Sequence, residues 1–184
     1  HLTREEIDSR ADAAWLEHAR QQLDEAIHGA ERMQNIVRDL KTFSRVDDEQ
    51  QGNVDVQSVL ESSINICWNE VRHRATLERD FSEIPPVDAN ESRLGQVFLN
   101  LLINAAQAMP ERGVSANRIT VRTFTDEQGW AVIEVADNGT GIEPGRMSRV
   151  FEPFFTTKPV SEGTGLGLSI CRNIVREAGG TIEA

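Results

Sequence analysis

The chain has 184 residues, of which 39% are hydrophobic and 27% charged, and its formal net charge is −11. This composition is typical of a soluble globular protein, and the length allows one ordinary domain plus an extra element. The acidic balance argues against nucleic acid as a partner, because binding to a phosphate backbone depends on clustered Lys and Arg. With no apolar run of about 18 residues and no signal peptide, we expect a cytoplasmic chain without membrane contact, although a longer protein could be anchored elsewhere.

The first part of the chain, residues 1–46, is predicted to be one long helix with a heptad seam. Two apolar series run through it at seven-residue spacing: Leu16, Leu23, Ala30 and Val37, and Ala19, Ala26, Met33 and Leu40. Such a stripe needs partner helices, as in a bundle or coiled coil. The spacing therefore predicts a homodimer through helix 16–40, with a single helix packed on its own domain as the alternative. Residues 47–53 are polar and are predicted to be a linker.

Residues 54–184 are predicted to form an α+β domain, a two-layer α/β sandwich. In chain order we expect a helix at 56–74, a strand at 75–81, an extended piece at 84–89, a helix at 91–109, a hairpin at 117–139, a helix at 167–178 and the start of a strand at 181–184. Asn90 is a candidate N-cap. Gly129 lies in the expected hairpin turn, and Gly179 follows the expected end of the last helix. The strands are expected to be mostly antiparallel.

Asp137 ends a strand and should point to the same face as Ile133 and Val135, the expected core face. A carboxylate there costs several kcal/mol unless it is hydrogen-bonded. It is either a structural residue that starts the turn "DNG" or an acceptor for an exocyclic amine at the bottom of a pocket. Gly139 and Gly141 would let the backbone approach a flat ring closely.

Asn100 and Asn104 are four residues apart and so lie on one face of the expected helix. Two amides on a helix face can simply be solvated. An amide oxygen is also a hard, neutral ligand that suits Mg²⁺ together with water and phosphate oxygens.

Gly163, Gly165 and Gly167 stand immediately before and at the start of a helix, in "GTGLGLSI". Backbone N–H groups at a helix N-terminus attract anions, so this segment is a candidate phosphate cradle. The chain has no G-x-x-x-x-G-K-[ST], which excludes a P-loop, and no strand directly before these glycines, as a dinucleotide fold would require.

The segment "FEPFFTTK" holds Phe151, Phe154 and Phe155. Three exposed phenylalanines would form a costly apolar patch. We therefore expect all three to pack against the domain and to anchor one end of a loop. Lys158 ends the segment and could supply a cation toward phosphates.

Four motifs, "NLLINAAQAM", "DNGTGI", "FEPFFTTK" and "GTGLGLSI", resemble the N box, first glycine box, F box and second glycine box of bacterial sensor histidine kinases. These kinases share a Bergerat-type ATP-binding fold with gyrase, Hsp90 and MutL. The resemblance covers about residues 54–184. The helix that ends in "ERMQNIVRDLKTFSR" resembles the second helix of the family's dimerisation and histidine-phosphotransfer domain.

The resemblance implies a catalytic ATP-binding domain that transfers the γ-phosphoryl group of ATP to a histidine, for relay to a response regulator receiver domain. Asn104 would be the principal Mg²⁺ ligand with Asn100 assisting, and Asp137 would bind the adenine amine. Lys158 would be a catalytic cation. The remaining nucleotide-binding residues would be Gly139, Gly141, Ile142, Phe151, Gly163, Thr164, Gly165, Leu166 and Gly167. Residues from about 143 to 164 would form the ATP lid.

Two features depart from the family pattern. None of His1, His18, His28 and His73 stands in a motif of the type H-E-x-x-N-P-L, and the chain stops at "TIEA", where the family continues into another strand. We therefore expect a fragment that binds nucleotide without autophosphorylating. A hydrolytic ATPase of the same fold is disfavoured, because such relatives carry a Glu where Asn100 stands. A non-catalytic dimerising module remains a further alternative.

Overall fold

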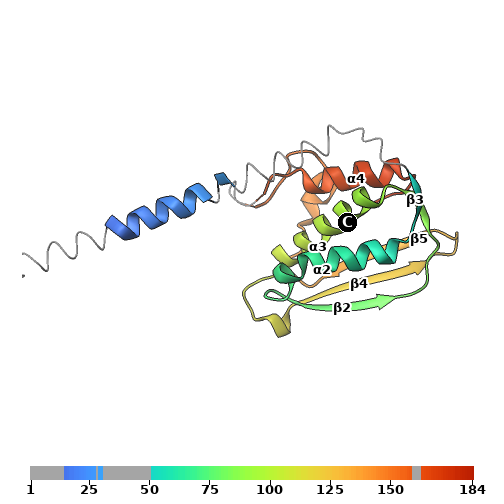
Figure 1. The fold of residues 1–184 in the computed structure, drawn as a ribbon, viewed down its shortest axis with the longest axis horizontal. Helices are drawn as coiled ribbons and strands as arrows, with labels where there is room; N and C mark the ends of the chain where they lie inside the picture. The colour runs from blue at the N-terminus through green and yellow to red at the C-terminus, as the bar shows by residue number, and fades with distance from the viewer. Residues whose placement is uncertain (1–14, 28, 31–50, 159–162) are drawn as a thin grey trace, which may run out of the picture. The chain divides into compact units, whose positions relative to one another are not determined.

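The computed structural model describes residues 15–27, 29–30, 51–158 and 163–184, and the chain divides into two compact units. One unit groups residues 1–45 with 156–164, and the other groups 46–155 with 165–184. In the first unit, residues 15–27 are helical, and Leu16, Leu23 and Ile27 are exposed on that helix (Figure 1). The seam positions Met33, Val37 and Leu40 lie outside the described residues.

The second unit is a two-layer α/β sandwich with its helices on one face of a sheet, as predicted (Figure 1). The helices are α2 (Val56–Val71), α3 (Glu91–Gln107) and α4 (Gly167–Glu177), and the short 3₁₀ helices are η1 (Val114–Ala116) and η2 (Pro144–Arg149). The sheet has the order β2 (Thr76–Phe81), β4 (Arg118–Thr125), β5 (Ala131–Asp137). A separate pair joins β1 (Gly52–Val54) to β3 (Val87–Ala89).

Two of the three described strand pairings, β1 with β3 and the predicted hairpin of β4 with β5, are antiparallel as expected, but the three-stranded sheet is mixed because β2 runs parallel to β4. Parallel neighbours need a crossover connection, which is usually helical. Here α3 lies between β2 and β4 in the chain and supplies it. The crossover connection therefore includes α3, the helix that carries Asn100 and Asn104.

The predicted starts of α2 and α3 are confirmed, whereas α2 ends at Val71 and α3 at Gln107, a few residues before the predicted ends. The Asn90 side chain accepts a hydrogen bond from Arg93 N at 3.0 Å and begins α3. Asp55 does the same for α2, accepting from Gln57 N at 3.1 Å. These caps satisfy backbone N–H groups that a helix start leaves without partners.

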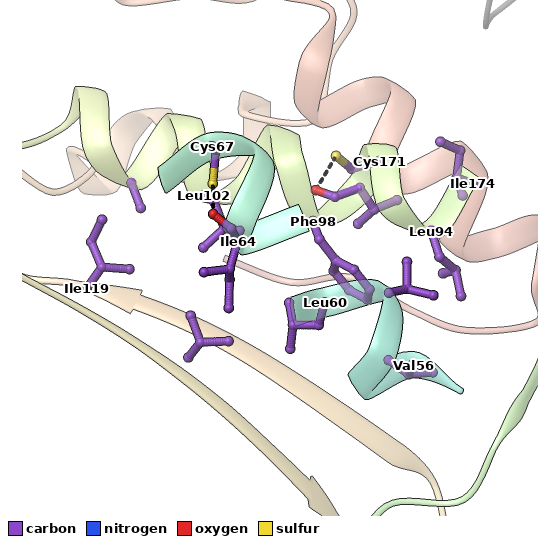
Figure 2. Packing of buried hydrophobic residues seen from close by; sticks show 14 of the residues in the cluster. Val56, Leu60, Ile64, Cys67, Leu94, Phe98, Leu102, Ile119, Cys171 and Ile174 are labelled. Carbon is purple, nitrogen blue, oxygen red and sulfur yellow. Dashed lines mark hydrogen bonds between the residues drawn. The ribbon is translucent and has the colours of Figure 1, made fainter. Parts of the chain in front are cut away.

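One hydrophobic core joins the two layers (Figure 2). Its fully buried side chains come from all three helices and from β4, and include Val56, Leu60, Ile64, Leu102, Ile119, Val121 and Cys171. Both cysteines, Cys67 and Cys171, are free and buried, as expected of small core side chains.

Two local predictions were wrong. Residues 181–184 do not form a strand, and Ile182 instead packs against the core. A strand is stabilised by pairing with a neighbour, and no strand of the described residues pairs with this segment. Gly52 and Asn53, assigned to the linker, are part of β1, because they pair with Ala89 and Asp88 of β3.

Candidate functional site

Helix α3 is the backbone of the candidate site. Asn100, Asn104 and Ala108 follow one another at four-residue steps along one stripe, and span about 12 Å of helix axis. All three residues are half-buried. The two ends of this stripe contact segments that are far away in the sequence.

At the C-terminal end of the stripe, the first glycine box (137–142) lies directly against α3. Thr140 N donates to Ala108 O at 3.0 Å, and Gly139 N donates to the Asp137 Oδ1 at 2.8 Å. A Cβ atom added to Gly139 would lie 2.5 Å from Ala108 O and 2.8 Å from Asp137 Oδ1. Only glycine therefore fits here without moving the backbone.

Asp137 is exposed, so the prediction that it lies within the apolar core face was wrong. It does share a face with the half-buried Ile133 and Val135, but it is the last residue of β5, beyond the part of the strand that the helices cover. Its carboxylate is therefore solvated. Oδ1 forms the turn with Gly139, and Oδ2 has no partner in the described part of the chain.

At the other end of the stripe, Asn100 contacts the start of α4. Its Nδ2 donates to Gly167 O at 3.4 Å, and a Cβ added to Gly167 would lie 3.7 Å from the Asn100 Cγ. Unlike α2 and α3, α4 has no side-chain cap within the described residues. The start of α4 therefore lies beside Asn100 and has no capping side chain from its N-cap residue, Leu166.

The loop before α4 turns sharply against the F box. Gly165 has a φ of +66°, and a Cβ there would overlap the backbone carbonyl of Phe154. Phe154 also has a positive φ, 66°, and its side chain is 72% exposed. The prediction that it anchors the loop was wrong, because this backbone conformation and the packed Gly165 direct its ring to solvent.

The other two phenylalanines of the F box are half-buried and each meets an arginine. The Arg172 guanidinium lies 5.8 Å from the Phe151 ring centroid, and the Arg149 guanidinium lies 4.6 Å from that of Phe155. Arg172 belongs to α4, so the first of these contacts joins the F box to the helix that begins within the second glycine box.

A family model described as "Histidine kinase-, DNA gyrase B-, and HSP90-like ATPase" matches residues 89–184, from the end of β3 to α4 and beyond. The chain belongs to this ATPase family. Membership implies an ATP-binding domain and agrees with the fold and with the arrangement of the glycine boxes around α3.

The curated relatives include a sensor protein and a sensor histidine kinase. The C4-dicarboxylate transport sensor protein DctB of Pseudomonas aeruginosa is 35% identical over 91% of this chain and 27% of its own length. Sensor histidine kinase ZraS of Escherichia coli K12 is 34% identical over 84% of this chain and 32% of its own length. The chain therefore spans about a third or less of these two curated relatives.

Solved structures show the same fold. The mycobacterial sensor histidine kinase MprB has a TM-score of 0.60 and 32% identity, covering 70% of this chain and 80% of that one. Full-length ShkA in complex with AMPPNP has a TM-score of 0.64 over 97% of this chain and 35% of that one. At 22% identity, ShkA supports the fold alone.

Other predicted site residues of this ATPase domain lie outside the stripe on α3. Leu166 is buried directly before α4, whereas Ile142 is exposed. Gly141 has a φ of +70°, and a Cβ added there would have nothing within 4 Å. Glycine is required at this position by the left-handed backbone of the turn. It is not required by any close contact.

Lys158, Gly163 and Thr164 belong to the segment 156–164, which is part of the other compact unit. Lys158 N donates to Thr156 Oγ1 at 3.1 Å, and a Cβ on Gly163 would lie 2.5 Å from the same oxygen. The two ends of this segment are thus close together. The nucleotide roles of these three residues stay predictions.

Two contacts were missed by sequence reasoning. Ala108 O receives the first glycine box, and Cys171 lies 3.7 Å from Asn100 Nδ2. Cys171 follows Gly167 by four residues, one helical turn, which is the available sequence signal for its position.

In the described part of the chain, no helix has the length and apolar character needed to cross a membrane.

Proposed function

We propose that this chain is the ATP-binding catalytic part of a sensor histidine kinase in a two-component system. One observation carries the proposal: the stripe on α3 holds Asn100 and Asn104 between the first glycine box at Ala108 and the uncapped start of α4 at Gly167. Family membership and the sensor kinases among the relatives support it.

The adenine end of the nucleotide belongs at the first glycine box. Oδ2 of the exposed Asp137 is an acceptor for an exocyclic amine, while Oδ1 keeps the turn through Gly139 N. Gly139 has no side chain and lies close to Ala108 O, so a flat ring can approach the backbone of the first glycine box.

The phosphate end belongs at the start of α4. Successive N–H groups at an uncapped helix N-terminus, together with the helix dipole, attract anionic oxygens. They compensate locally for a chain whose net charge is −11. Gly167 leaves the backbone accessible there, because it carries no side chain.

A magnesium ion fits the remaining polar groups. Nδ2 of Asn100 donates to Gly167 O and to Cys171 Sγ, so its Oδ1 is the atom left to face a ligand. Asn104 lies one turn further along the same stripe, between the two glycine boxes. When bound, Mg²⁺ would neutralise charge on the phosphate oxygens. We assign Asn104 as the principal ligand and Asn100 as the assisting one.

The asparagines favour phosphoryl transfer over hydrolysis. An amide cannot accept a proton, so Asn100 cannot act as the general base that activates water. Slow hydrolysis preserves the γ-phosphoryl group for a histidine, which we place outside these 184 residues, because none of the four histidines has the expected motif. From that histidine the phosphoryl group would pass to an aspartate of a response regulator.

The helix of residues 15–27 supports a homodimer as the kinase's assembly. Leu16 and Leu23 of the predicted seam are exposed in the single chain, as is Ile27 beside it. Burial of such a stripe against a second copy would remove apolar surface from water. Sedimentation showing only monomer at high concentration would contradict this part of the proposal.

The nucleotide assignment is tested by calorimetric titration of Mg²⁺ and a non-hydrolysable ATP analogue into the chain. Asp137→Asn keeps an oxygen for the turn but removes the carboxylate, and we expect it to abolish binding. Asp126→Asn is the matched control, because Asp126 Oδ1 accepts from Gln128 N and Trp130 N in a similar turn at the far end of β5.

The outcomes separate the candidate functions. No binding by the wild-type chain at millimolar nucleotide would refute the kinase and ATPase functions together. Unchanged affinity in Asp137→Asn would remove the adenine assignment alone. In a separate assay with ATP itself, rapid phosphate release would favour the hydrolytic ATPase over the kinase.

A further inference from the structure

Cys171 is buried on α4 one turn after Gly167, and its sulfur faces the amide of Asn100. Asn100 Nδ2 lies 3.7 Å from Cys171 Sγ and 3.4 Å from Gly167 O. The amide group therefore meets two acceptors on α4, one from the backbone and one from a side chain. This is more than a core cysteine needs for packing alone.

The thiol proton of Cys171 has a separate acceptor. Sγ donates to Val97 O of α3 at 3.8 Å, the bond drawn as the dashed line at Cys171 in Figure 2. Since the single S–H is directed there, the sulfur lone pairs are left to accept from Asn100. The thiol thus relays a hydrogen bond from the side chain of Asn100 to the backbone of the same helix, one turn earlier.

These contacts distinguish the two orientations of the Asn100 amide. With Nδ2 toward α4, both of its protons have acceptors, and Oδ1 makes no hydrogen bond within the described residues. With the amide flipped, Oδ1 would face Gly167 O with no proton between the two oxygens. Only the first orientation presents an oxygen to a metal ion or to a water bound to it.

We propose that Cys171 is a positioning residue, which fixes the Asn100 amide so that Oδ1 faces the Mg²⁺–nucleotide. The inference rests on the function proposed above and adds a residue to it. In this proposal Cys171 is not a ligand of the metal or of the phosphates and acts through Asn100. Its removal should therefore weaken the response to Mg²⁺ and spare metal-independent nucleotide binding.

The test measures nucleotide affinity of the 184-residue chain with a fluorescent ADP analogue, in EDTA and across a Mg²⁺ titration. Cys171→Val fills the site without an acceptor, and we expect it to raise the half-saturating Mg²⁺ concentration about fivefold, the effect of one weak hydrogen bond. Affinity in EDTA should be unchanged. Cys171→Ser keeps a donor and an acceptor and should restore the wild-type Mg²⁺ response.

Cys67→Val is the matched control. Cys67 is also buried, but it lies on α2 and its Sγ donates to Ile64 O at 3.6 Å, on its own helix. It should leave the Mg²⁺ response unchanged. In an Asn100→Ala background, Cys171→Val should add no further loss, because the group that it positions is already gone. An unchanged Mg²⁺ response in Cys171→Val, or an equal loss in EDTA, would overturn the proposal.

A second measurement does not need nucleotide binding. The Asn100 side-chain NH₂ resonances, identified by their absence in Asn100→Asp, should exchange with solvent more slowly than those of the exposed Gln128. Equal exchange rates would refute the orientation even if nucleotide binds. Protected Asn100 protons in a chain that binds no nucleotide would retain the orientation and refute the proposed function instead.

Discussion

Gly139→Ala should damage both the stability of the catalytic unit and its nucleotide site. Gly139 is not in the left-handed region, so alanine could adopt its backbone conformation. The obstacle is space: the new Cβ would lie 2.5 Å from Ala108 O and 2.9 Å from Ala108 C. These are backbone atoms at the end of α3, and they cannot move aside as a flexible side chain would.

The cost follows from what has to shift. Separating the glycine box from α3 breaks the bond from Thr140 N to Ala108 O, worth about 1 kcal/mol, and overpacking adds about 1–3 kcal/mol. A destabilisation of about 2–4 kcal/mol should lower Tm by roughly 5–15 °C in a domain of this size. Movement of Asp137 with the box should weaken nucleotide binding at least tenfold.

Thermal unfolding with and without nucleotide measures both effects. Gly145→Ala is the control, since nothing lies within 4 Å of its added Cβ and its φ is not left-handed. It should be neutral or slightly stabilising, because alanine restricts the unfolded chain. A Gly139→Ala chain with the Tm and the affinity of wild type would show that the contact with α3 does not constrain the site.

Three further changes test the local structure. Asn90→Ala should cost about 1 kcal/mol in urea unfolding by removing the cap on Arg93 N, while Asn90→Gly should cost only a few tenths; equal losses would contradict the capping role. Phe154→Gly should stabilise the chain by about 1 kcal/mol, since it relieves a left-handed φ and gives up an exposed ring; a clear loss would mean that the ring packs. Burial raises the pKa of the Cys67 thiol above that of a thiol in the unfolded chain. The neutral buried thiol therefore contributes its full stability below the unfolded pKa, and this contribution is lost as the pH rises through the higher pKa of the folded state. Wild type should therefore lose more stability than Cys67→Ala between about pH 8 and pH 10, and parallel alkaline losses would refute this.

Local signals predicted the elements that depend on neighbouring residues. The cap at Asn90, the alternation of β-branched residues along β4 and β5, and the glycine that ends α4 each act within a few residues. The stripe of Asn100 and Asn104 is likewise a matter of helical spacing. For these features, the physics that forms the element is visible in the sequence around it.

Features that depend on distant segments were not visible. The residues of β2 give no sign of whether it pairs parallel or antiparallel, and its direction follows from the crossover through α3. The two-residue period placed Asp137 on the correct face but could not show that the helices leave the end of β5 uncovered. The outward ring of Phe154 depends on Gly165, which packs against its carbonyl from eleven residues away.

The spacing of residues on α3 is a local feature of the sequence, but it decides which distant segments can meet at the site. Asn100 and Ala108 are separated by eight residues of helix, about 12 Å along the axis and about 80° around it, and their contacts fix where the two glycine boxes lie. One extra residue between them would add only about 1.5 Å, but also about 100° of rotation, and would turn Ala108 to the side opposite Asn100. The two boxes could then not face one ligand across Asn104. A change in helix length at this point would therefore disrupt the site through rotation much more than through distance.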